Sequence, residues 1–300
     1  MLNVEVIPYG GWQRCLRIRN RRIEAVITAE VGPRVIRFGF IGGPNEFVEY
    51  PDQMGLTGGD AYRSYGGHRL WVAPEDRNRT YAPDNAPVEW RVEGETLRVT
   101  APVERSTGVQ KEIQFWIDPE IDTMHLVHRI TNCSGAPAAL SAWALSVMAP
   151  GGRAIVPQEP FIPHPEALLP SRPLVLWSYT DMSDPRWVWG KELIQLFQDS
   201  SAVSPQKIGM LNKAGWLAYA NGERLFLKTH TTKTGSAYPD HGSSAEVFTN
   251  TRMLELETLS PVTVLAPGAV LEHEEHWFLY DGVRLEREEA AILRSLSVIR

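Results

Sequence analysis

Two glutamates, Glu255 and Glu257, have the spacing in this chain that says most about chemistry. They lie in segment 253–259, whose residues alternate as in a β-strand, with Leu254 and Leu256 at the intervening positions. Side chains alternate faces along a strand, so the two carboxylates should point the same way, about 6–7 Å apart, and the leucines into a core. Such a pair fits either a solvated outer face or one wall of a polar cleft. Nearby Trp, His and Arg residues favour the cleft.

A second group of reactive side chains follows a Gly-Gly pair, where His68, Arg69 and Trp71 come close together in sequence. Arginine offers a fork of donors to hydroxyl or carboxylate oxygens, and an imidazole can carry a proton near neutral pH. The alternative is a simple turn in which Arg69 pairs with Glu75 or Asp76. Both interpretations remain open at this point.

Asp240 and His241 lie in a Tyr-Pro-Asp-His-Gly turn, which fits either the rim of a pocket or an ordinary exposed turn. The sequence from His273 to His276 lacks the helical spacing of a zinc signature. His125 and His128 should lie on opposite faces of one strand, so they cannot chelate one ion together. We therefore expect no metal site, and no phosphate-binding loop or dinucleotide fingerprint suggests a cofactor.

Composition narrows the class of protein. The 300 residues carry a formal net charge of -6, are 43% hydrophobic and 22% charged, and contain no long basic run. These values fit a globular protein and disfavour nucleic-acid binding. The N-terminus has no signal-peptide pattern and no window is apolar enough for a membrane helix, so we expect a cytoplasmic protein without membrane contact. The two cysteines, Cys15 and Cys133, permit one disulfide bridge but do not require it.

The elements expected to position these side chains are mostly strands. Short alternating segments bounded by Gly, Pro and Asn predict one large antiparallel sandwich, an all-β fold formed by residues 1–300 as a single domain. The segments expected to form strands are 22–27, 34–40, 88–93, 96–100, 110–118, 123–132, 138–148, 215–219, 224–229, 253–259 and 270–280. Two helices are expected, one from Asp184 to about residue 199 and one over 286–297.

Ten tryptophans, many beside Gly, Pro, His or Arg, bear on the ligand. Flat rings with neighbouring donors suit a sugar, which presents a C–H face and a ring of hydroxyls. Trp71 and Trp143 are the rings expected to contact it, together with Arg69, Asp240 and His241. Most tryptophans are largely buried, so a core position is favoured for any single ring, whereas the set as a whole favours a carbohydrate cleft.

The order of motifs resembles the galactose mutarotase-like, or aldose 1-epimerase-like, superfamily. Gly67-His68-Arg69 matches its Gly-Arg loop, Asn132-Cys133-Ser134 matches a turn before the middle strand, and Leu256-Glu257-Thr258 matches its late Leu-Glu-Thr strand. The resemblance covers about residues 20–280. It implies a β-supersandwich with a few short helices and a concave sugar-binding face. It also implies that Glu257 is the general base, with Glu255 and His68 in support.

One position departs from that family. Its epimerases carry an acid histidine on the middle strand, where this chain has Trp143. Mutarotation needs an acid opposite the base. The resemblance therefore leaves three alternatives: an epimerase with another acid, a hydrolase or lyase on the same fold, and a non-catalytic module that binds a sugar or oligosaccharide. Oligomeric state is left open.

Overall fold

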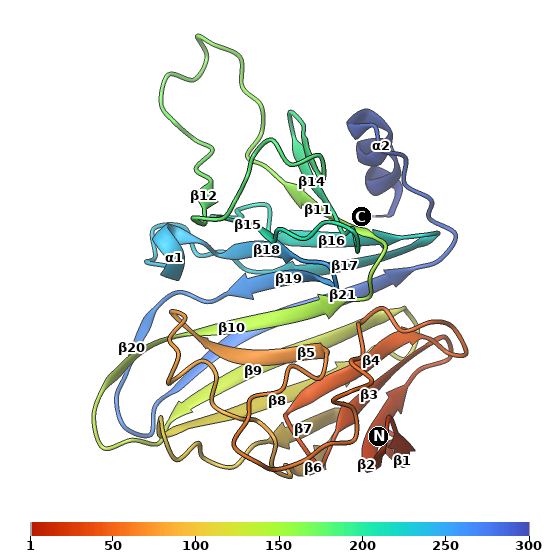
Figure 1. Ribbon diagram of the computed structural model, residues 1–300, viewed down its shortest axis with the longest axis vertical. Helices are drawn as coiled ribbons and strands as arrows, with labels where there is room; N and C mark the ends of the chain where they lie inside the picture. The colour runs from red at the N-terminus through yellow and green to blue at the C-terminus, as the bar shows by residue number, and fades with distance from the viewer. Residues whose placement is uncertain (1, 300) are drawn as a thin grey trace.

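The protein is described by a computed structural model covering residues 2–299. In it, about 45% of the chain is strand and 5% is helix. The strands form two antiparallel sheets (Figure 1). The predicted all-β architecture is confirmed. Strands 34–40, 96–100, 123–132, 138–148 and 270–280 have the bounds expected from the sequence.

The first sheet has eleven strands among the described residues and carries the candidate site. In spatial order it contains β1 (Glu5–Tyr9), β2 (Trp12–Arg19), β3 (Ile23–Thr28), β4 (Arg34–Phe40), β5 (Gly67–Ala73), β10 (Ala138–Met148), β19 (Leu254–Leu259), β18 (Ala245–Thr249), β15 (Gln206–Met210) and β12 (Val175–Leu176), with β20 (Thr263–Leu265) paired to β10. The central neighbours β5, β10 and β19 are far apart in sequence.

The second sheet has ten strands in the same part of the chain. Its order is β13 (Trp187–Trp189), β14 (Leu193–Phe197), β11 (Arg153–Pro157), β16 (Trp216–Asn221), β17 (Arg224–His230), β21 (Val270–Tyr280), β9 (Thr123–Asn132), β8 (Val109–Ile117), β7 (Thr96–Thr100) and β6 (Glu89–Glu93).

A hydrophobic core fills the space between the sheets. Leu254 and Leu256 of β19 are part of it, as the alternation in the sequence predicted, and Phe115 and Leu126 of the second sheet belong to the same core. Burying each such side chain contributes about 1.5–3 kcal/mol, so the alternation fixes which face of each strand turns inward. The alternate residues of the same strands therefore point to the opposite, outer face of the first sheet.

The prediction of a helix starting at Asp184 is wrong. Asp184 accepts hydrogen bonds from the backbone and guanidinium of Arg186, and the following residues form the hairpin β13–β14 instead. Strand β14 completes its hydrogen bonds on β11, whose edge needs a partner. Tertiary pairing has therefore outweighed a weak helical pattern.

The terminal helix is confirmed as α2 (Glu289–Ile299), and Ile292 and Leu296 pack on the outer face of the second sheet. A four-residue turn, α1 (Pro239–Gly242), is the other described helix, and neither has the length and apolarity needed to cross a bilayer. Cys15 is buried and Cys133 is exposed, and both are free thiols, so the disulfide that the sequence allowed does not form.

Candidate functional site

The outer face of the first sheet gathers charged residues from strands that are distant in sequence. Leu145 on β10 pairs with Arg69 on β5 and with Glu257 on β19, so these three side chains stand on one face. Glu246 on β18 lies opposite Glu257, and Lys207 on β15 projects from the same face. The register of four strand pairs therefore builds the site, and no short stretch of sequence contains it.

A pocket of about 310 Å³ opens on this face, within the size range of small-molecule sites. Its wall contains four of the residues singled out from the sequence: Arg69, Trp71, Trp143 and Glu255. The other lining residues are Tyr62, Ser64, Glu75, Tyr81, Leu145, Tyr179, Lys207, Phe248 and Met253.

Aromatic rings form one side of the pocket. The centroid of Trp71 lies 5.3 Å from that of Trp143 and 5.1 Å from that of Tyr81, and Tyr62 lies 5.8 Å from Trp71. The guanidinium of Arg69 lies 4.2 Å from the Trp71 ring centroid, which is a cation–π distance. The pocket thus offers ring faces next to charged donors and acceptors. The tyrosines come from connecting loops, where no motif singled them out.

Glu255 is the carboxylate that lines the pocket. Arg69 donates from Nη2 to Glu255 Oε1 at 3.4 Å and from Nη1 to Ser64 Oγ at 3.0 Å, so neither Glu75 nor Asp76 is its partner. Oε2 of Glu255 has no hydrogen-bond partner among residues 2–299. Burial raises the pKa of Glu255 to about 7, with a further contribution from Glu257 and opposition from Arg69. The group can therefore change protonation near neutral pH.

Glu257 lies beside this pocket but is fully buried and does not line it. The indole N–H of Trp143 donates to Glu257 Oε2 at 2.8 Å, and Lys207 Nζ donates to the same oxygen at 2.9 Å. Lys207 also forms an ion pair of 2.7 Å with Glu246. Burial alone would lower the pKa of Lys207, but the two glutamates hold it well above its ordinary value. The sequence analysis did not single out Lys207 or Glu246. The alternation of residues 206–210, which is typical of a strand, was the signal that could have placed Lys207 on the outer face.

Asp240 and His241 lie at the edge of this group and do not line the pocket. Asp240 interacts with Glu246 across the α1 turn, and burial raises the pKa of both carboxyl groups. The two residues have φ values of 48° and 56°, in the left-handed region that non-glycine residues rarely adopt. His241 is exposed, and no contact joins it to the pocket.

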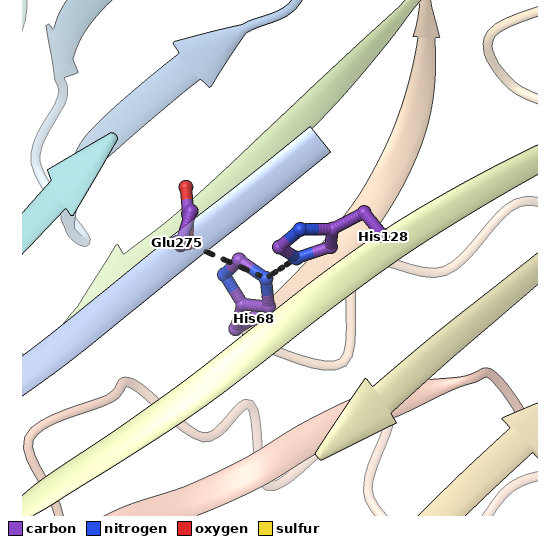
Figure 2. A group of neighbouring side chains, drawn as sticks. All are labelled: His68, His128 and Glu275. Atoms are coloured by element: carbon purple, nitrogen blue, oxygen red, sulfur yellow. Dashed lines mark hydrogen bonds and ion pairs between the residues drawn. The ribbon is translucent and has the colours of Figure 1, made fainter. Parts of the chain in front are cut away.

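The expectation that His68 shares a pocket with Glu257 is wrong. Strand β5 begins at Gly67, so His68 and Arg69 are consecutive strand residues and point to opposite faces. His68 is fully buried between the sheets, where its Nε2 lies 2.7 Å from Nε2 of His128 and 4.0 Å from Glu275 Oε2 (Figure 2). Glu275 and His128 come from β21 and β9 of the second sheet, so the cluster bridges the two layers.

The metal-ligating atoms of His68, His128 and Glu275 lie within 4.8 Å of one another, which raises the question of a metal ion. The partners of the two imidazoles are already assigned by geometry. His128 Nδ1 must donate to the carbonyl of His273 at 3.0 Å, so its Nε2 accepts from His68. His68 Nδ1 then accepts from the hydroxyl of Ser146 at 2.9 Å. Both imidazole lone pairs are therefore in use.

An ammonium group completes this cluster. Lys228 Nζ lies 2.7 Å from Glu275 Oε1 and also donates to Ser146 Oγ at 3.2 Å and to the carbonyl of Leu256 at 3.1 Å. The indole of Trp277 donates to Glu275 Oε2 at 2.8 Å. Burial lowers the pKa of His68 and that of His128, which favours neutral rings. The donor set fits a closed hydrogen-bond network around one Lys–Glu pair, and it fits a divalent cation poorly.

Comparison with known proteins identifies the fold. No family model matches the chain, and no curated protein matches its sequence. Among solved structures, it superposes on a galactose mutarotase-like protein from Lactobacillus casei ATCC 334 with a TM-score of 0.60 and 8% identity, covering 89% of this chain and 100% of that one. A galactose mutarotase-like protein from Clostridium acetobutylicum gives a TM-score of 0.56 and 9% identity, over 93% and 99% of the two chains.

The chain also matches a TPR-domain containing protein from Parabacteroides distasonis ATCC 8503, with a TM-score of 0.57 and 12% identity. That match covers 92% of this chain and 49% of the other, so this chain spans about half the length of that protein. The fold is therefore that of the galactose mutarotase-like proteins, as the sequence motifs indicated. At these identities the likeness concerns the fold.

Proposed function

We propose that this protein binds an aldose in the pocket on the outer face of the first sheet and interconverts its anomers, with Glu255 as the general base. The observation that carries the proposal is Glu255 itself. It lines an aromatic pocket, has one oxygen held by Arg69 and the other without a protein partner, and has a pKa of about 7. A base whose pKa lies near the working pH is the most effective.

Glu257 was the base expected from the family resemblance, and its position supports a different role. Both the Trp143 indole and Lys207 bond its Oε2, and no part of it lines the pocket. Glu257 therefore anchors these two side chains in the pocket wall, and Glu255 meets the anomeric hydroxyl. The two carboxylates on one strand face then have separate tasks.

The experiment measures exchange between the α and β forms of D-galactose and D-glucose by NMR, with and without the protein. Glu255→Gln removes the proton acceptor while it keeps the size of the side chain, and we expect the catalysed rate to fall about 100-fold or more. Glu274→Gln, at an exposed glutamate of β21, is the matched control and should leave the rate unchanged. The catalysed rate of the unaltered protein should fall as the pH drops below about 7, because Glu255 becomes protonated.

A second candidate, a non-catalytic sugar-binding module, is favoured by Trp143. This residue stands where the resemblance expects an acid histidine, and its N–H is committed to Glu257. Calorimetric titration separates the two functions. Saturable heat on adding galactose or glucose, without any catalysed exchange, supports the module, whereas exchange that depends on Glu255 supports the enzyme.

A further inference from the structure

We propose that Lys207 is the acid that gives a proton to the ring oxygen when the sugar ring opens. This inference rests on the proposed function and assigns its second catalytic group. Ring opening moves two protons: one leaves the anomeric hydroxyl, and one must reach the ring oxygen as its bond to the anomeric carbon breaks. Glu255 accepts the first proton, so a donor has to stand elsewhere in the same pocket.

The surroundings of Lys207 hold its ammonium group in a fixed place. Its Nζ lies 2.9 Å from Glu257 Oε2 and 2.7 Å from Glu246 Oε2. Two indole rings flank it, with ring centroids of Trp143 at 4.9 Å and Trp177 at 4.7 Å. The ammonium donates one hydrogen bond, to Glu257, and its contact with Glu246 is an ion pair. An ammonium has three N–H donors, and no further acceptor for Lys207 is found among residues 2–299, although Lys207 lines the pocket. The ammonium therefore has N–H capacity left for a ligand.

The guanidinium of Arg69 and the indoles of Trp71 and Trp143 also line the pocket wall, but neither kind of group is an acid at neutral pH. The Nη atoms of Arg69 bond Ser64 and Glu255, and a guanidinium does not give up its proton in proteins. The indole N–H of Trp143 donates to a carboxylate and is not acidic.

The phenols of the pocket are weaker candidates than the ammonium. The hydroxyl of Tyr81 donates to Glu75, and that of Tyr62 is buried from solvent with no hydrogen-bond partner among residues 2–299. Tyr179 lies on a loop, and no residue in the described part of the chain hydrogen-bonds its hydroxyl to orient it. A charged donor also makes the stronger hydrogen bond to an oxygen that gains negative charge.

The proton balance closes over one cycle. The anomeric O–H proton moves to the Glu255 carboxylate as the anomeric carbonyl forms, and the bond from the anomeric carbon to the ring oxygen breaks. The ring oxygen takes a proton from the Lys207 ammonium, which becomes an amine; a sugar alkoxide is a far stronger base than an amine. After rotation about the bond between the first two carbons, the amine removes the hydroxyl proton as the ring closes. Glu255 returns its proton to the carbonyl oxygen.

The test compares two substitutions of Lys207 in the full-length protein, with α/β exchange of D-galactose and D-glucose followed by NMR. Lys207→Arg keeps the positive charge beside Glu257 and Glu246 but cannot transfer a proton. Lys207→Met combined with Glu257→Gln and Glu246→Gln removes the acid while leaving neither of its two glutamate partners as an unpaired buried carboxylate. We expect both variants to fold, to bind sugar within about threefold of the unaltered protein, and to lose about 100-fold or more in exchange rate. Lys191→Met, at a lysine that stacks on Phe161 outside the pocket, is the control.

The outcomes distinguish this inference from the function on which it rests. Exchange within threefold of normal in a folded Lys207→Arg protein, together with loss of exchange in Glu255→Gln, would overturn the role of Lys207 alone. No exchange by the unaltered protein on either sugar would overturn both proposals. Loss of exchange in both Lys207 variants and in Glu255→Gln, with binding retained, supports both.

Discussion

The raised pKa of Glu255 has a consequence for stability that can be measured without knowing any substrate. Between pH 4.5 and about 7 the folded protein holds a proton on this carboxyl group that the unfolded chain has lost. Stability therefore falls as the pH rises through this window, because the buried group must ionise. Glu255→Gln removes the titration, so the difference in unfolding free energy between variant and unaltered protein should increase with pH.

The size of this effect follows from the shift. A change from 4.5 to about 7 is about 2.5 pKa units. At 1.36 kcal/mol per unit this corresponds to about 3 kcal/mol, most of it between pH 5 and pH 8. The charges that face Glu255 are Arg69, Glu257, Lys207 and Glu75, and the substitution leaves all four in place. The substitution can also change the unfolding free energy by an amount that is the same at every pH. The prediction concerns only the part that varies with pH.

Chemical denaturation at pH 5, 6, 7 and 8 measures the difference directly, provided that the slopes with denaturant stay equal. Glu274→Gln at the exposed position serves as the reference for loss of a carboxylate alone. A difference between Glu255→Gln and the unaltered protein that stays constant within about 0.5 kcal/mol from pH 5 to pH 8 would refute the reasoning, because a shift of this size must appear in the linkage.

Two further predictions concern the frame beneath the pocket. Lys228→Met leaves the Glu275 carboxylate buried without its cation and should lower the free energy of unfolding by about 3–5 kcal/mol in denaturant titrations. The double variant Lys228→Met with Glu275→Gln should recover part of this loss. A loss below about 1 kcal/mol in the single variant would contradict this prediction. Gly67 has a φ of +72°, and a Cβ there would meet the carbonyl oxygen of Val35 at 2.3 Å. Gly67→Ala should therefore be more destabilising than Gly94→Ala, where φ is +64° and nothing lies within 4 Å; equal losses in Tm would show that the close approach has no effect.

The sequence predicted strands well because the information for them is local. Alternating segments such as 123–132 and 270–280 carry their own boundaries in turn residues, and the structure retains them. The helix predicted from Asp184 is wrong because its local helical pattern was weak. The edge of β11, distant in sequence, decided between a helix and a hairpin.

Only part of the candidate site could be predicted from the sequence. Arg69, Trp71, Trp143 and Glu255 were found because each lies in a distinctive local motif, and they meet in one pocket. Lys207 was missed because its importance comes from strand register, which brings β15 beside β18 and β19.

His68 shows a different kind of error. It was placed with Arg69 because the Gly-Gly pair suggested a flexible loop, yet both glycines are held in left-handed conformations against neighbouring backbone. The alternation rule, applied from Gly67 onwards, would have put the two residues on opposite faces.

The pocket takes its charged groups from strands and its tyrosines from loops, and this division bears on how its selectivity can change. A one-residue insertion in β15, β18 or β19 would turn Lys207, Glu246 or Glu255 to the other face, so such insertions should be absent from natural variants that keep the pocket. The connections that carry Tyr62, Tyr81 and Tyr179 lie outside the strands and tolerate exchange. Loop grafting at these three connections is therefore the route by which a library could alter which ligand the pocket accepts while its charged groups stay in place.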